Sequence, residues 1–204
     1  MPSERPRSGA VPFVGLTGGI AAGKSTALAA LERLGAATLS TDAVVHELYG
    51  TDAVRDAVVA RFGPEVAPEG VVDRARLATV VFSDDHDRAW LEALLWPLVS
   101  ERVASWREAA ASPKPPPRAL IVEVPLLFEA GHQDLYDATI AVTAPEALRS
   151  ARAQARGHRS LDERAARQLS QAEKAALATH VVANDGDVQA LESKLSAILA
   201  MLER

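Results

Sequence analysis

Short apolar runs alternate with longer amphipathic stretches along most of the chain. Runs rich in branched apolar residues predict five strands, over residues 11–17, 37–40, 119–124, 138–142 and 181–183. The third run, ALIVEV, is continuous, which is typical of a strand buried on both faces of a sheet. Because helical patterns separate the runs, the sequence predicts an α/β fold: a five-stranded parallel sheet with helices on both faces.

Two of the predicted helices show a clear apolar stripe, and we assign no chemistry to the last helix of the chain. Residues 24–34 place leucines on one face, and Gly35 is suited to end that helix. The last helix has Asp185 or Asp187 available as its cap. Its apolar stripe recurs at helical spacing and consists of Val188, Leu191, Leu195, Ile198, Leu199 and Leu202.

A long stretch between the second and third predicted strands contains helical patterns alone. The predicted helices cover residues 52–62, 73–82, 84–95 and 98–111. Asp73 and either Ser83 or Asp84 are suited to cap two of them. Pro97 is expected to separate the last two, because proline interrupts helical hydrogen bonding. So long an excursion from the sheet indicates an insertion, and insertions in α/β enzymes often hold the substrate.

The strongest motif lies between the first strand and the helix that follows it. Residues 18–25 read GGIAAGKS, a complete GxxxxGK[ST] phosphate-binding loop, or P-loop, in its usual strand–loop–helix setting. Glycines let successive backbone N–H groups face one anion, and the helix N-terminus adds its positive dipole end. Lys24 is expected at the β- and γ-phosphates and Ser25 at Mg²⁺. The predicted nucleotide-binding residues are Gly18, Gly19, Ile20, Ala21, Ala22, Gly23, Lys24, Ser25 and Thr26.

Two acidic residues lie at the carboxyl ends of predicted strands, where ligands of open α/β sheets bind. Asp42 could accept a proton from an attacking hydroxyl or could cap a helix over residues 43–49; the two roles are about equally supported and are compatible. Glu123 ends a run of four apolar residues, as the acid of a Walker B strand does, although most such strands carry aspartate. We favour a Mg²⁺-side role for Glu123 over a purely structural one.

A positive segment lies between the fourth and fifth predicted strands. It contains Arg149, Arg152, Arg156, Arg159, Arg164 and Arg167, with only Asp162 and Glu163 opposing them. The first three share a helical face, and guanidinium groups bind phosphate and neutralise charge in phosphoryl transfer. A run of charges is usually only a solvated face. The whole cluster, however, favours a lid over bound nucleotide, with Arg152 as the best single candidate.

Composition restricts the function further. Of 204 residues, 48% are apolar and 24% charged, which indicates a globular chain with a sizeable core. The net charge of −5 argues against bulk nucleic-acid binding. The absence of cysteine excludes disulfides, thiolate catalysis and Cys-ligated zinc. Without an evident signal or spanning segment, we expect a cytoplasmic protein that binds no membrane and is a monomer or weak oligomer.

The domain organisation expected from these patterns is a flexible tail and one kinase-like domain. The tail covers residues 1–10 and the domain residues 11–204, with a core (11–41, 118–142 and 180–204), a helical substrate-binding insertion (42–112) and a lid region (about 145–178).

Two segments resemble the dephospho-coenzyme A kinase family. Residues 15–26 (GLTGGIAAGKST) resemble the opening of these kinases, and residues 123–131 (EVPLLFEAG) resemble their second signature. Gln171 and residues 181–186 (VVANDG) also match, so the resemblance spans roughly residues 11–200. It implies a three-layer P-loop kinase of the nucleoside monophosphate kinase type. Such an enzyme transfers the γ-phosphate of ATP to the ribose 3′-hydroxyl of dephospho-coenzyme A, the last step of coenzyme A synthesis.

The resemblance also implies roles for single residues. Asp42 matches the catalytic aspartate, Lys24 and Ser25 match the phosphate and metal contacts, and Arg152 matches a lid arginine. The chain departs from the family pattern on the side expected to bind the acceptor. The departures are Ser40, His46 and Trp96, where the family usually has aspartate, arginine and histidine, and Glu123, where aspartate is common.

Two other functions fit part of this pattern. Another small-molecule kinase of the same fold, acting on a nucleoside or nucleotide, would keep the P-loop and lid but would lack the PLLFE segment. A regulatory nucleotide switch would normally carry an NKxD base-reading motif, which this sequence lacks.

Overall fold

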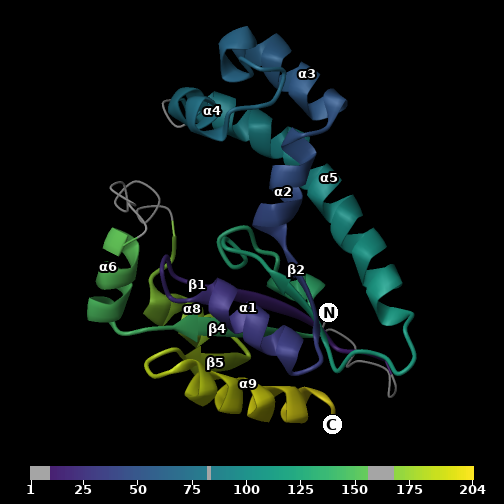
Figure 1. Ribbon diagram of the computed structural model, residues 1–204, viewed down its shortest axis with the longest axis vertical. Helices are drawn as coiled ribbons and strands as arrows, with labels where there is room; N and C mark the ends of the chain where they lie inside the picture. Colours follow the sequence, from purple (N-terminus) through teal and green to yellow (C-terminus); the bar gives the residue numbers. More distant parts are fainter. Residues whose placement is uncertain (1–9, 82–83, 156–167) are drawn as a thin grey trace. The chain divides into compact units, whose positions relative to one another are not determined.

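The computed structural model describes residues 10–81, 84–155 and 168–204 (Figure 1). Its centre is a five-stranded, all-parallel sheet in the order β2-β3-β1-β4-β5. The strands are β1 (Phe13–Gly18), β2 (Ala37–Ser40), β3 (Leu120–Glu123), β4 (Ala138–Thr143) and β5 (His180–Ala183). All five predicted strands and the predicted fold class are confirmed.

Helices cover both faces of the sheet. On one face, α1 (Lys24–Arg33) and α9 (Val188–Leu202) pack side by side over buried residues of β1, β3, β4 and β5 (Figure 1). On the other face lies α8 (Gln171–Leu177), which contacts β1 and β4. Alternation along β1 explains this division, because Val14 and Leu16 face α1 and α9 while Thr17 faces α8. The core therefore has three layers.

The ends of the core helices follow the sequence signals. Gly35 adopts a left-handed φ of 94° directly after the C-cap of α1, as a terminating glycine does. Asp187 caps α9 by accepting a hydrogen bond from Ala190 N at 2.8 Å. Asp185, the other candidate cap, instead pairs with Lys194. A 3-10 turn, η2 (Gln133–Leu135), precedes β4, and a further helix, α6 (Glu146–Ala155), follows β4.

The described residues within Thr41–Trp106 form a second compact unit, and those on either side of this range form the first. The second unit is helical, with α2 (Thr41–Tyr49), α3 (Asp52–Phe62), η1 (Pro64–Val66), α4 (Arg74–Val81) and most of α5 (Asp85–Ala111). Asp73 and Asp84 accept backbone hydrogen bonds at the starts of α4 and α5, as predicted, and Ser83, the alternative to Asp84, lies outside the described residues. A substrate-binding role for this unit stays a prediction.

The predicted break at Pro97 is wrong. Residues Asp85–Ala111 form one helix of 27 residues, with Pro97 inside it. Proline removes one backbone hydrogen bond and leaves the carbonyl of Ala93 without its helical partner. Both Pro97 and Ala93 are exposed, so water can solvate that carbonyl. The loss is therefore small enough for the helix to continue.

His180 at the start of β5 makes stability depend on pH. Burial lowers the pKa of His180 below its usual 6.5. Between the lowered pKa and 6.5 the unfolded chain binds a proton more readily than the folded one, so stability falls as pH falls through that interval. We expect His180→Gln to lose less stability than the wild type from about pH 7.5 to about pH 5. Urea unfolding midpoints at both pH values test this, and equal losses would contradict it.

No helix in the described part of the chain is long and apolar enough to cross a bilayer.

Candidate functional site

The P-loop closes between the end of β1 at Gly18 and the start of α1 at Lys24. Ala22 N donates to Gly19 O at 3.1 Å, and Ala21 adopts a positive φ of 59° within this turn. Gly23 has a left-handed φ of 98°, and a Cβ there would collide with the amide of Asn184. Glycine at this position is therefore required both by backbone conformation and by space.

The N-terminus of α1 is open to an anion. Gly23 is its N-cap and provides no side-chain hydrogen bond, and the first turn contains no acidic residue. The first N–H groups of a helix have no partner within the helix, and they carry its positive partial charge. A phosphate group is the ligand that such a terminus binds best.

Lys24 and Ser25 lie at this helix start. Lys24 Nζ donates to Gly18 O at 3.2 Å, so the side chain folds back over the loop. Its ammonium group therefore lies at the first residue of the loop. Ser25 is exposed in the first turn of α1, which leaves its hydroxyl accessible from solvent. The roles predicted for both residues, at the phosphates and at Mg²⁺, stay predictions.

The P-loop is held from the C-terminal part of the chain. Buried Asn184 donates from Nδ2 to Ala22 O at 2.9 Å. Arg149 of α6 donates from Nε to Ile20 O at 3.0 Å and pairs with Glu146 at 2.7 Å. Two loop carbonyls thus have side-chain donors, which fixes the loop before nucleotide arrives. Arg149 therefore supports the loop, a role that its place in a charge run did not reveal.

Arg152 lies one turn further along α6. Its Nη1 atom is buried and has no hydrogen-bond partner within the described structure. The same atom is 3.7 Å from the place that a Cβ on Gly23 would occupy, so the guanidinium lies against the P-loop. A buried cationic donor without a partner is costly, and such groups are found mainly where a ligand completes them. The predicted Arg156, Arg159, Arg164 and Arg167 lie outside the described residues.

Glu123 lies at the carboxyl end of β3, opposite Ser40 of β2 and Leu16 of β1. Its carboxylate is buried, and Oε2 accepts a hydrogen bond from Ser40 Oγ at 2.9 Å. Glu123 and Ser40 are thus direct cross-strand neighbours on β3 and β2 and are joined by a side-chain hydrogen bond. Ser40, a departure from the family pattern, orients this carboxylate at the edge where the P-loop begins.

The Ser25 hydroxyl and the Glu123 carboxylate are oxygen ligands of the kind that Mg²⁺ prefers in nucleotide sites. No group of three or more His, Asp or Glu side chains among the described residues could hold a metal. Mg²⁺ in kinases needs no such cage, because it keeps several waters and is bound by one or two carboxylates together with substrate phosphates. A hydroxyl at Ser25 and a carboxylate at Glu123 fit that donor set.

Asp42 does not cap a helix over residues 43–49. Helix α2 begins at Thr41, so Asp42 is inside the first turn instead of preceding a helix over residues 43–49. It is exposed, and a carboxylate there interacts favourably with the helix dipole. Asp42 belongs to the second unit, but it follows Ser40, the last residue of β2, by only two positions. Its catalytic role stays a prediction.

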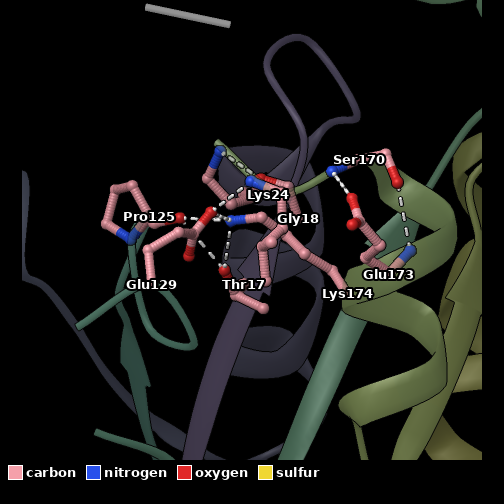
Figure 2. Close-up of polar contacts among 9 residues, drawn as sticks. Thr17, Gly18, Lys24, Pro125, Glu129, Ser170, Glu173 and Lys174 are labelled. Atoms are coloured by element: carbon pink, nitrogen blue, oxygen red, sulfur yellow. Dashed lines mark hydrogen bonds and ion pairs between the residues drawn. The ribbon is translucent and has the colours of Figure 1, made fainter. Parts of the chain in front are cut away.

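Sequence reasoning missed a buried cluster beneath the P-loop. Lys174 of α8 is fully buried and forms an ion pair with Glu129 at 2.9 Å (Figure 2). Its ammonium also contacts Thr17 Oγ1 and Pro125 O. One signal was available: only four of the 22 basic residues are lysines, and this one lies in a short helix next to Gln171.

The chain matches known kinases over nearly its whole length. The family model "CoaE: Dephospho-CoA kinase" matches residues 12–190. The dephospho-CoA kinase of Moorella thermoacetica is 40% identical over 202 residues, which is 94% of this chain and 92% of that protein. The one of Deinococcus radiodurans is 40% identical over 193 residues, covering 93% and 92%.

Solved structures agree with this match. The structure of TT1252 from Thermus thermophilus has a TM-score of 0.71 at 32% identity, covering 95% of this chain and 98% of that one. Dephospho-CoA kinase from Campylobacter jejuni (TM-score 0.62, 23% identity, coverage 94% and 97%) and shikimate kinase from Bacteroides thetaiotaomicron (0.52, 16%, 96% and 100%) share the fold. With the P-loop, the three-layer core and the match over residues 12–190, the chain belongs to the dephospho-CoA kinase family.

Proposed function

We propose that this protein transfers the γ-phosphate of ATP to the ribose 3′-hydroxyl of dephospho-coenzyme A, giving coenzyme A and ADP. The observation that carries the proposal is the P-loop with Arg152 Nη1 buried and unpaired against it. That arrangement suits a phosphoryl group on which negative charge develops, and family membership supplies the acceptor.

Different residues of the chain carry out the separate parts of phosphoryl transfer. The P-loop N–H groups and Lys24 bind the β- and γ-phosphates, and Arg152 neutralises charge in the transition state. Asp42 positions the 3′-hydroxyl and takes its proton as the new O–P bond forms and the bond to the ADP oxygen breaks. Ser25 and Glu123 would hold Mg²⁺, directly or through water, and the ion would supply charge neutralisation on the phosphate oxygens.

ADP formation against a panel of acceptors tests the proposal. The panel contains dephospho-coenzyme A, adenosine and nucleoside monophosphates, each with ATP and Mg²⁺. We expect ADP release with dephospho-coenzyme A only, together with a coenzyme A product phosphorylated at the 3′ position. Preference for adenosine or a monophosphate would identify a different small-molecule kinase. ATP hydrolysis that no acceptor accelerates would favour a nucleotide switch.

Arg152→Met should separate activity from stability. Methionine keeps much of the apolar packing but removes a guanidinium whose Nη1 atom is buried without a partner among the described residues, so we expect an unchanged or slightly raised melting temperature. The rate constant kcat should fall about a hundredfold or more, as when an arginine finger is lost, with a much smaller change in ATP affinity. Thermal unfolding, ATP titration and steady-state kinetics on one preparation measure all three.

Arg118→Met is a matched control for this experiment. Arg118 is also partly buried, but it pairs with Glu203 away from the P-loop. Its loss should leave kcat unchanged. An Arg152→Met protein with wild-type kcat would return Arg152 to the role of a surface helix residue. The cytoplasmic location and the monomeric or weakly associating state stay predictions.

A further inference from the structure

Lys174 is a buried charge to which the steps above give no role. Its side chain is fully buried and extends from α8 toward the carboxyl ends of two strands. The Nζ atom donates to Pro125 O at 2.6 Å and to Thr17 Oγ1 at 3.4 Å, and it lies 2.9 Å from Glu129 Oε1. Figure 2 shows these groups gathered around the ammonium, next to Gly18 and Lys24.

The partners of Lys174 come from the two segments that define the nucleotide site. Thr17 is the residue before Gly18, where the P-loop begins, and its hydroxyl also contacts Pro125 O at 3.2 Å. Pro125 follows Glu123, the last residue of β3, by two positions. One ammonium group thus links Thr17 of β1 to Pro125 after β3, beyond the hydrogen bond from Val124 N to Leu16 O that joins the same two segments.

Glu129 connects the same ammonium to the start of α8. Its Oε1 atom accepts hydrogen bonds from both Lys174 Nζ and Leu169 N, each at 2.9 Å. Its Oε2 atom is buried and has no hydrogen-bond partner among the described residues. An ion pair that is buried and incompletely hydrogen-bonded contributes little to stability compared with apolar residues of the same size. Stability alone therefore does not explain this pair.

Helix α8 in turn holds the helix that bears the arginines. Gln171 lies in the first turn of α8 and forms two hydrogen bonds with the backbone of Ala144, accepting from its N–H at 2.9 Å and donating to its carbonyl at 3.0 Å. Ala144 lies two residues before α6, which carries Arg149 and Arg152. Lys174 is consequently linked to the P-loop through Thr17 and to α6 through α8.

We infer that Lys174 is a positioning residue for phosphoryl transfer, which with Glu129 holds the P-loop and α6 in the arrangement that brings Lys24 and Arg152 to the same phosphate. The inference rests on the proposed kinase function. Misplacement of a reacting group by about 1 Å can cost about a hundredfold in rate, so loss of the anchor should act on kcat more than on nucleotide binding.

The experiment compares Lys174→Met with the double variant Lys174→Met/Glu129→Gln. The single variant leaves the Glu129 carboxylate buried without its cation, so both stability and kcat should fall. The double variant removes both charges and should recover much of the melting temperature. Its kcat should nevertheless stay about 10- to 100-fold below that of the wild type, while the dissociation constant for ATP changes less than about threefold.

The readouts separate positioning from simple stabilisation. Recovery of kcat together with melting temperature in the double variant would overturn the inference, as would wild-type kcat in the single variant. If Lys174→Met does not fold, the double variant alone decides. Arg118→Met, which breaks the pair of a partly buried arginine with Glu203, is the control and should keep wild-type kcat.

Failure of the proposed function would look different. The wild type would then show no transfer to dephospho-coenzyme A, and the variants would be assayed with whichever panel acceptor, or water, the wild type uses. The same loss of kcat at nearly constant ATP affinity supports the positioning role there, and its absence contradicts it.

Discussion

The Lys24→Ala variant should fold normally but lose almost all phosphoryl-transfer activity. Lys24 carries an ammonium group that contacts the P-loop at Gly18 O, at 3.2 Å. Removing a single preorganised donor from a developing oxyanion lowers kcat about 10²–10³-fold, and loss of a full positive charge should reach at least that range. Steady-state turnover with saturating ATP and dephospho-coenzyme A measures the effect.

The control for this variant is Lys114→Ala. Lys114 is exposed and lies outside the site, so its removal should change neither turnover nor melting temperature. Lys24 is only partly buried, so Lys24→Ala should also melt close to the wild type. Near-normal turnover in a folded Lys24→Ala protein would remove the P-loop lysine from the mechanism.

Asp42→Asn should strongly reduce phosphoryl transfer while changing the melting temperature only slightly. The side chain is exposed in the first turn of α2, where a carboxylate contributes about 0.3–1 kcal/mol through the helix dipole. For a domain of this size, the melting temperature should then fall by no more than about 4 °C. Asparagine cannot accept a proton at neutral pH, so transfer should fall by about 10²–10⁴, the range for a general base.

A neighbouring acid provides the comparison for Asp42. Glu47 is exposed in the same helix, and Glu47→Gln should lower neither turnover nor ATP affinity. Because the transition state of phosphoryl transfer is loose, an effect of Asp42→Asn near the lower limit would indicate positioning of the hydroxyl more than proton removal. Unchanged turnover with a lowered melting temperature would make Asp42 a purely structural residue.

The sequence predicted those parts of the fold that depend on local signals. The P-loop region could be read directly, because an apolar strand, a glycine-rich turn and an amphipathic helix follow one another within residues 13–33. Capping residues such as Asp73 and Asp187 were equally accessible, since a cap acts on its own helix. The prediction at Pro97 was wrong because exposure of the neighbouring carbonyl, which decides the outcome, is not visible in the sequence.

The missed parts of the site depend on contacts between distant segments. Lys174 in a short helix is typical of a surface residue, and only the fold shows that it is buried against β1 and the segment after β3. The pairing of Ser40 with Glu123 likewise follows from strand register, which brings together residues 83 positions apart. Arg149 belonged to a recognised cluster, yet its bond to Ile20 O required the three-dimensional placement of α6.

The strand order has a consequence for how the protein folds during synthesis. Strand β1 emerges first but pairs only with β3 and β4, and Asn184, which holds the P-loop at Ala22, follows 162 positions later. Contacts between residues so distant along the chain lose a large loop-closure entropy before they contribute to stability. Folding is therefore slow, and strands made early lack their partners. A ribosome-bound chain therefore carries the complete nucleotide-binding motif long before it has a nucleotide site. We expect the chain to acquire affinity for ATP only when β5 and Asn184 after it have left the exit tunnel.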